Sequence, residues 1–431
     1  MNSFALPDTL KNMMKPNYLL TFLFIFFILF STSCSNDISG PNGQEPGRGI
    51  ELPAELTQAE KQLVESGHSF SFDVFKSTVE HDTVADNIFI SPLSLSVALG
   101  MTMNGAQGET QEQMRQTLAF HGMDIEEINE GYRFLIERLI TADPSVQMQI
   151  ANSVWNRQEF EVNADFLDKL ETYFDAEAQE LDFDDPSSVD TINNWVEDNT
   201  NGLIETIIDR IPPSMVMYLI NAIYFKGDWT HTFDKEDTKS RPFYLENGSE
   251  INVDMMRQDG AFNTYFSDEV RMIDLPYGDS LYTMSLMMPA DPDTKIETFI
   301  ADQLSQENFN TWLDNIAYRQ TVVNLPKFEI EYELTMNEVL KSLGMEVAFN
   351  PNEADFRGIN PNGGLFISQV KHKTFVTVDE EGTEAAAVTS IGMELTSMPP
   401  SFNANRPFIF LIREQQSGTV VFMGKVSHPA G

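Results

Sequence analysis

The alternation of apolar and polar side chains predicts several strands along the chain. Thr374 to Val378 alternates apolar residues with Thr, and Val146 to Val154 alternates in the same way. Because successive strand residues point to opposite faces, each run would present one face to a core. Met215 to Phe225 differs, since it is apolar on both faces apart from Asn221. That pattern predicts a central strand covered on both sides.

Helical periodicity accounts for much of the remaining sequence. Thr57 and Glu60 form a capping-box pattern at the start of the first predicted helix. Ser91-Pro92 is a second helix start, a capping hydroxyl followed by Pro, and it precedes the apolar and small residues of Leu93 to Met103. Further helical patterns lie within 125–139, 189–196, 296–316 and 334–343, and strand-like runs fill 241–288 and 408–423. The sum predicts an α+β domain.

The segment from Asp379 to Pro400 has the pattern of a strand without a partner. Asp379 to Gly382 is a turn-like break, and Thr383 to Thr389 contains no Pro, no Gly and no bulky side chain. The face that carries both charges, Glu384 and Glu394, would be exposed to water. The other face suits burial and holds Thr383, Ala385, Ala387, Thr389, Ile391 and Met393. The alternative is a surface linker rich in Ala and Thr.

Composition excludes several classes of function. The 431 residues include 66 acidic and 27 basic side chains, a net charge of −39. Such a charge argues against nucleic-acid binding and favours solubility. A weaker alternative is that it attracts basic binding partners. The single cysteine, Cys34, leaves no disulfide framework and no Cys-based metal site. The six His are scattered without HExxH spacing, so we expect neither a metal nor a cofactor.

The amino terminus has the pattern of a targeting segment. Lys11 and Lys15 precede the apolar run from Leu19 to Phe30, which is shorter than the ~20 residues of a membrane span and suits a signal peptide over 1–33. Ser31 to Cys34 resembles a bacterial lipoprotein cleavage box in which Cys34 takes the lipid, although Ser31 stands where Leu is usual. A conventional secretory cleavage or an uncleaved anchor is the alternative.

The tether and the domain follow this segment. Residues 34–55 are rich in Asn, Gly and Pro and predict a flexible tether. Residues 56–431 then form one folded domain. We therefore expect an exported monomer held by a lipid on Cys34 at the membrane of a bacterial envelope or cell surface, with an extracellular location as the alternative.

A series of motifs runs through 56–431 in a fixed order. They are Asn87 to Leu95 (NIFISPLSL), Asn221 to Trp229 (NAIYFKGDW), Asn324 to Phe328 (NLPKF), Val339 to Gly344 (VLKSLG), Ala354 to Phe356 (ADF), Glu380 to Ala387 (EEGTEAAA) and Phe422 to Pro429 (FMGKVSHP). Through these motifs, taken together rather than singly, the domain resembles the serpin family across 56–431. The resemblance implies three sheets, about nine helices and an exposed reactive loop above the main sheet.

Roles for buried polar residues follow from the same resemblance. Ser91, Ser94, Asn221 and His372 match a hydrogen-bonding cluster beneath strands that must part. Trp229 matches a packing residue at the point where the loop enters the sheet. Polar side chains in otherwise apolar segments need one another as partners, which supports a shared site.

The resemblance implies a protease inhibitor that acts as a suicide substrate and is not an enzyme. Counting from the first hinge Glu places the scissile bond at Thr396–Ser397, with Leu395 and Met393 as alternative positions. Thr396 suits the shallow pocket of elastase-like proteases, and papain-like cysteine proteases are a second target class. No Lys or Arg occurs from Gly382 to Pro400, which argues against trypsin-like targets. The insertable hinge comprises Glu380, Gly382, Thr383, Glu384, Ala385, Ala386, Ala387 and Val388.

Three other functions compete with inhibition. A non-inhibitory serpin-like carrier or binding protein usually has bulky, charged or Pro residues in the hinge, and Ala385 to Val388 has none. A hydrolase would need a nucleophile motif such as GxSxG, which is absent from the sequence. A surface adhesin is supported by the predicted lipid alone.

Overall fold

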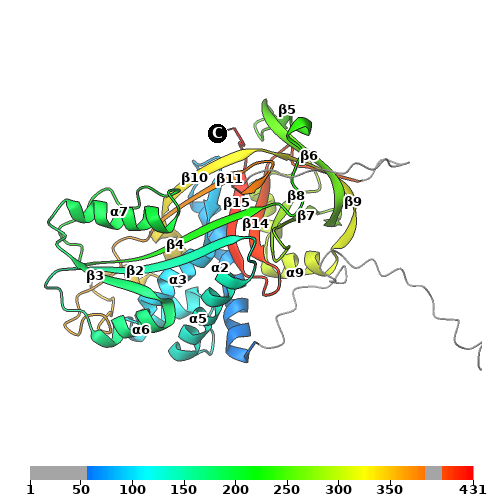
Figure 1. The fold of residues 1–431 in the computed structure, drawn as a ribbon. Coiled ribbons are helices and arrows are strands. Elements are labelled where there is room, and N and C mark those ends of the chain that lie inside the picture. The colour runs from blue at the N-terminus through cyan, green and yellow to red at the C-terminus, as the bar shows by residue number, and fades with distance from the viewer. Residues whose placement is uncertain (1–55, 384–399, 431) are drawn as a thin grey trace, which may run out of the picture. The chain divides into compact units, whose positions relative to one another are not determined.

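Helices and sheets are both prominent in the computed structural model, which describes residues 56–383 and 400–430 (Figure 1). This described part contains nine α-helices and three hydrogen-bonded sheets, which confirms the α+β class and the expected number of each. No helix in it is long and apolar enough to cross a membrane.

The largest sheet has nine strands and forms the centre of the core. Along the sheet the order is β1 (Ile88–Ile90), β15 (Val420–Val426), β14 (Phe408–Glu414), β8 (Tyr282–Pro289), β7 (Val270–Tyr277), β6 (Glu250–Phe266), β9 (Ala317–Pro326) and β13 (Ser401–Asn403), and β5 (Lys239–Tyr244) also pairs with β6. Neighbours are antiparallel except β13 and β9, which run parallel. Every residue of β8, β14 and β15 is buried.

Two smaller sheets line one cavity, and no strand of the described residues joins them. One has the order β12 (Gly382–Thr383), β4 (Met217–Asp228), β2 (Gln147–Arg157) and β3 (Ala176–Leu181), and the other joins β10 (Phe328–Thr335) to β11 (Lys371–Val378). The long strand β4 pairs with β2 from Lys226 to Met217, whereas its other edge pairs with β12 at two residues only. In Figure 1 β4 and β11 run alongside each other without forming one sheet.

The helices pack around these sheets. Their bounds are α2 (Gln58–His81), α3 (Pro92–Met103), α4 (Gly108–Thr117), α5 (Ile125–Thr141), α6 (Ala164–Phe174), α7 (Ser187–Asn199), α8 (Ile296–Gln303), α9 (Gln306–Asp314) and α10 (Asn337–Ser342), with short 3-10 turns at η2 (Lys235–Asp237) and η3 (Val347–Phe349). The capping box predicted at Thr57 and Glu60 is present, and Ser91 caps α3 by accepting from the backbone of Ser94.

Two apolar clusters cover the two faces of β4. The main core includes Phe225 and, partly buried, Leu219 and Ile223. A smaller cluster holds Ile220 of β4 together with Ile192 and Val196 of α7. Alternate residues of β4 therefore pack against the main core and against α7, as period-two geometry requires.

Two predicted elements differ from those observed. The run predicted from Met215 to Phe225 forms a strand from Met217 onward that is covered on both faces, but β4 is hydrogen-bonded along most of one edge and at only two residues of the other. Face burial and edge pairing are separate properties, and the apolar pattern reports only the first. The helix expected from Leu334 begins at Asn337, because residues up to Thr335 extend β10 along β11.

Candidate functional site

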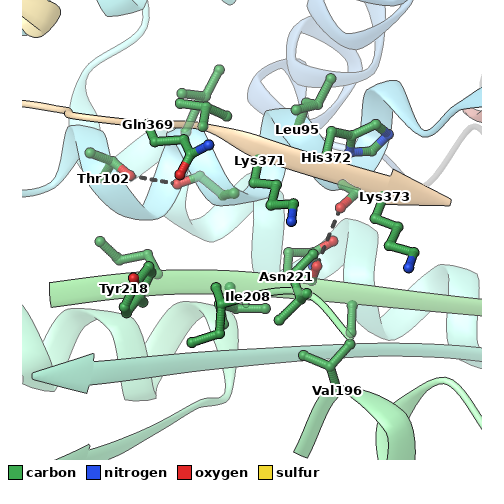
Figure 2. Close-up of a pocket in the computed structure, with 18 of the residues that line it drawn as sticks. Leu95, Thr102, Val196, Ile208, Tyr218, Asn221, Gln369, Lys371, His372 and Lys373 are labelled. Carbon is green, nitrogen blue, oxygen red and sulfur yellow. Dashed lines mark hydrogen bonds between the residues drawn. The ribbon is translucent and has the colours of Figure 1, made fainter. Parts of the chain in front are cut away.

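A cavity of about 420 Å³ lies between β4 and β11, where no strand of the described residues runs. It is lined by β4, β11, α3, α7 and the segment that follows α7. Figure 2 shows Tyr218 and Asn221 of β4 on one side and Lys371, His372 and Lys373 of β11 on the other. In the described part of the chain, only β12 pairs with the cavity-facing edge of β4. Free N–H and C=O groups along such edges are a template for an added strand.

The first residues of that missing strand are already in place as β12. Gly382 pairs with Asp228, and Thr383 pairs with Gly227. Thr383 is buried, and its hydroxyl lies 2.9 Å from the Tyr277 hydroxyl. Gly382 has φ 152°, and a Cβ added there would overlap the backbone oxygen of Gly227. Only Gly fits this close approach of two backbones.

The turn before β12 is fastened to Trp229. The indole N–H of Trp229 donates to the Asp379 carbonyl at 3.0 Å, and its backbone N–H donates to the Glu381 carbonyl at 2.8 Å. Its ring stacks on Tyr277 with centroids 4.4 Å apart. The Asp379 carboxylate in turn accepts from the backbone N–H of Glu381 and of Gly382. Trp229 therefore lies at the entrance of the gap, in contact with the hinge.

Two lysines hold the hinge carboxylates. Glu380 is 4% exposed and accepts from Lys327 at 2.8 Å and from the Thr238 hydroxyl at 2.8 Å. Burial raises the pKa of Glu380, but these hydrogen bonds outweigh burial and the net shift is downward. Glu381 pairs with Lys235 at 2.6 Å. The hinge therefore enters the gap with each of its two glutamate carboxylates paired to a lysine.

A polar group beneath the middle of the gap includes Ser91 and His372. The Ser91 backbone N–H donates to His372 Nε2 at 2.9 Å, and the Ser91 hydroxyl donates to the Val421 carbonyl at 2.8 Å. Burial lowers the pKa of His372 to about 4. The imidazole is therefore neutral at pH 7, and since Nε2 accepts, its proton sits on Nδ1.

The same group continues across the gap to Asn221. The Ser94 hydroxyl lies 3.5 Å from the Asn221 carbonyl oxygen, at the outer limit of a hydrogen bond. The Asn221 side-chain N–H donates to Asn152 at 2.9 Å, and Asn152 donates to the Phe174 carbonyl. Among the described residues, the buried Oδ1 atom of Asn221 has no partner. Such an orphan acceptor is costly unless a donor arrives.

The structure brings the five predicted polar and packing residues to one gap, but not into one network. All four polar members line the cavity, and Ser91 contacts His372 while Ser94 approaches Asn221. No hydrogen bond joins His372 to Asn221 in the described part of the chain. Trp229 stands apart at the entrance.

Sequence reasoning missed several side chains that complete the site. Lys327 lies in the motif NLPKF, directly before the start of a strand. A charged residue at that position of the motif was the signal that could have identified it. Asn152 interrupts the alternation of β2, which marks it as a polar residue with a partner. No sequence signal marks Tyr277. Its hydroxyl bonds to that of Thr383 only because the fold brings these two distant residues together.

Other predicted residues lie outside the described ones. They are Cys34, Glu384, Ala385, Ala386, Ala387, Val388, Met393, Leu395, Thr396 and Ser397. Within the described ranges, no group of three or more His, Cys, Asp or Glu side chains is placed to hold a metal ion.

Comparisons with known proteins agree with this architecture. The model of the serpin (serine protease inhibitor) family matches residues 65–429. Human Serpin B11 is 35% identical over 84% of this chain and 97% of its own length, and human leukocyte elastase inhibitor is 34% identical over 86% and 100%. The crystal structure of the thermophilic serpin Tengpin in its native state matches with a TM-score of 0.78 at 32% identity, covering 89% of this chain and 97% of Tengpin. The chain belongs to the serpin family, whose members are protease inhibitors rather than enzymes.

Proposed function

We propose that this chain inhibits proteases as a suicide substrate and traps them covalently by inserting its reactive loop between β4 and β11. One observation carries the proposal. The β12–β4 ladder has two formed pairs at one end of an edge that no other described strand pairs with, and the next residues of the chain are small and free of Pro. The loop therefore needs only to continue a pairing that has begun.

Continuing the ladder by sequence number matches the loop to the gap. Each step forward from Thr383 is one step back along β4, so Ala385 would oppose Phe225 and Ala387 would oppose Ile223. Small side chains would thus meet bulky ones. The apolar residues further on would meet apolar partners: Ile391 opposite Leu219, and Met393 opposite Met217.

The polar residue Thr389 of the loop would come next to the polar side chains of the gap. Continued in the same register, Thr389 would come opposite Asn221, whose Oδ1 lacks a donor among the described residues. The backbone N–H of Asp379 donates to the Gly382 carbonyl at 3.1 Å. Counting onward from this hairpin pair would also bring Thr389 opposite His372 of β11. A hydroxyl both donates and accepts, so it can serve Asn221 Oδ1 and the Nδ1–H of His372.

In this mechanism the protease carries out the bond cleavage, and the inhibitor undergoes the conformational change. A protease serine attacks the Thr396 carbonyl, the Thr396–Ser397 amide breaks, and the Ser397 amine leaves with the C-terminal fragment. An ester then joins the protease to Thr396. Freed at one end, Thr383 to Thr396 inserts and carries the protease across the molecule, which distorts its active site before water hydrolyses the ester.

The energy for this motion comes from burial and pairing. Each apolar side chain that becomes buried contributes roughly 1.5–3 kcal/mol, and each added strand bond nets about 0.5–1.5 kcal/mol. Over the inserted segment the sum is on the order of 10 kcal/mol, opposed by the entropy of ordering it. The uncleaved form is then held kinetically rather than at equilibrium.

Thr396 points to an elastase-like target. Its small β-branched side chain fits a shallow pocket, and a relative of this chain bears the name leukocyte elastase inhibitor. Leu395 and Met393 offer alternative bonds for other enzymes, including papain-like cysteine proteases.

Mixing residues 35–431 with pancreatic elastase and running a denaturing gel tests the proposal. We expect a covalent complex and release of the fragment Ser397 to Gly431. If the loop is cleaved but no complex forms at any molar ratio of this protein to elastase, inhibition is contradicted and a non-inhibitory carrier is favoured.

We also propose export and lipid anchoring through Cys34, supported by the apolar run and the small residues before it. Cys34→Ala should release the protein from bacterial membranes. Unchanged membrane retention would count against a lipid.

A further inference from the structure

The cavity between β4 and β11 has the dimensions of a small-molecule pocket. Its volume of about 420 Å³ lies in the range of roughly 300–1,000 Å³ that is usual for ligand sites. Most of the side chains around it are apolar, and Val196, Ile208 and Tyr218 are among those that Figure 2 shows. Pockets of this kind bind their ligands chiefly by removing apolar surface from water. The cavity therefore suits a mainly apolar ligand.

β4 has several apolar side chains that line this cavity and are only half-buried. They are Met217, Tyr218, Leu219 and Ile223. In β14, by contrast, every residue is buried. An apolar molecule that displaces water from half-buried apolar side chains gains binding free energy. The strand beside the cavity therefore offers contact area that the rest of the core no longer has.

The segment after α7 forms one wall of the cavity and is held by side chains on both sides. The Asn193 side chain of α7 accepts from the backbone N–H groups of Ile207 and Ile208, at 2.9 and 3.0 Å, and donates to the Ile208 carbonyl at 2.8 Å. The next residue, Asp209, lies 3.6 Å from the Lys371 ammonium of β11. Ile207 and Ile208 both line the cavity. Because hydrogen bonds already fix this wall, a ligand has little of the chain to order, which favours its binding.

The charged side chains that line the cavity are already paired. They are Lys371 and Lys373, whose ammonium groups lie 2.9 Å from the carboxylates of Glu333 and Glu331 respectively. His372 also lines the cavity and is neutral at pH 7, because burial lowers its pKa to about 4. An ionic ligand would leave water without gaining a free counter-charge, which is costly. The lining therefore selects an uncharged molecule.

Phe366 marks the mouth of the cavity. Its side chain lines the cavity and is also 42% exposed to solvent. Gly363 and Gly364 precede it and line the cavity as well, with φ angles of 72° and 79° that favour glycine. An aromatic ring at the rim of an apolar cavity can stack on a ring of the ligand. We therefore expect a ligand that carries an aromatic ring.

We propose that the cavity binds one uncharged, mainly apolar molecule with an aromatic ring, and that Phe366 lies at its mouth and Ile208 in its wall. The binding itself does not depend on protease inhibition. Its consequence rests on the proposed function: an occupied cavity lacks room for a further strand between β4 and β11, so the bound protein should be cleaved without trapping the protease. The ligand thus acts as an antagonist of inhibition.

A matched pair of dyes tests the site. N-phenyl-1-naphthylamine is uncharged and fluoresces strongly in apolar surroundings, and 8-anilino-1-naphthalenesulfonate adds a sulfonate to the same ring system. We expect saturable binding of the uncharged dye, one molecule per chain, and binding of the sulfonate that is weaker by roughly ten-fold or more. Equal affinity for the two dyes would contradict the uncharged class of ligand. The absence of saturable binding of the uncharged dye would overturn the proposal.

Substitutions locate the bound dye. Ile208→Trp places a larger side chain in the wall and should weaken binding of the uncharged dye by roughly ten-fold or more. Phe366→Ala removes the ring at the mouth and should weaken binding roughly two- to ten-fold without unfolding the protein, because Phe366 is exposed. Tyr244→Ala is the matched control, since this ring is 48% exposed on β5 and does not line the cavity. An equal loss in Tyr244→Ala and Phe366→Ala would mean that the dye covers exposed rings in general, and would overturn the site.

A trapping assay measures the consequence separately. The number of inhibitor molecules consumed per trapped pancreatic elastase is measured with and without a saturating amount of the uncharged dye. That number should rise several-fold in the wild type, and Phe366→Ala should need more dye for the same rise. An unchanged number while the dye is bound would overturn the antagonism. A missing elastase complex without dye would instead contradict the proposed function, and the dye titration would still decide the site.

Discussion

β14 and β4 are both long strands of the fold, yet they differ in what lies along their two edges. β14 pairs with β8 on one edge and with β15 on the other, and all of its residues are buried. β4 pairs with β2 on one edge, while the other faces a cavity and meets β12 at two residues. The first region has no pairing left to gain. Among the described residues, the second is paired along this edge at two positions only, so the molecule combines a fully paired core with a sheet that has an open edge.

Cutting the loop should produce the largest change in this comparison. Filling the gap adds strand bonds and buried side chains, so the cleaved protein should gain on the order of 10 kcal/mol over the intact form. The measurement is the urea dependence of unfolding before and after nicking by papain. Intact and nicked proteins that unfold at the same urea concentration would show that the gap stays open.

Thr383→Arg should disable the gap without harming the core. Thr383 is buried against Tyr277, and a guanidinium there would be a buried charge without a partner, at a cost of several kcal/mol. We expect a protein that folds but is cleaved as a substrate. Equal trapping of elastase by the variant and the wild type would refute insertion at this position.

Leu411→Ala probes the fully paired region instead. Leu411 is buried in β14 between Ser285 and Met423, and removing its side chain should cost about 2–5 kcal/mol. Because β14 is already paired on both edges, we expect the intact and the cleaved forms to lose the same amount. A loss confined to one form would mean that the two regions are coupled.

A buried histidine lies in each region, and both predict acid sensitivity. Burial lowers the pKa of His372 in the gap and of His68 below the β14–β15 turn to about 4, against an ordinary value of 6.5. The unfolded chain takes up protons below about pH 6.5 and the folded chain does not until about pH 4. The free energy of unfolding should therefore fall across that window, by at most about 3 kcal/mol for each histidine, and level off below it. His372→Gln should remove about half of the drop, and an unchanged profile would contradict the assignment.

Thr389→Val should have the smallest effect. It keeps the shape of Thr389 but removes the hydroxyl proposed to serve Asn221, so the cleaved form should lose about 1–3 kcal/mol while the intact form is unchanged. The measurement is again urea unfolding of both forms. A loss in the intact protein would place Thr389 in contact with the core before cleavage.

The fold was largely predictable because its signals are local. The capping residues of α2 and α3, the alternation of β2 and β11, and the hairpin of β14 and β15 all appear in the sequence at the observed places. The family motifs also located the polar residues that line the gap. The open edge of β4 was not predictable, since an apolar run has the same pattern whether or not a second partner strand is present. Nor were the contacts of Tyr277 and Lys327 with the hinge, which depend on how distant segments meet.

The close approach of Gly382 to Gly227 fixes the end of β4 at which a further strand would begin to pair. On this side of β4, pairing among the described residues has begun at this end only, so under the proposed mechanism the loop would pair one residue after another in sequence order. The residue that carries the protease would then be the last to pair. A longer loop would therefore take longer to insert, and it would leave an acyl-enzyme more time for hydrolysis.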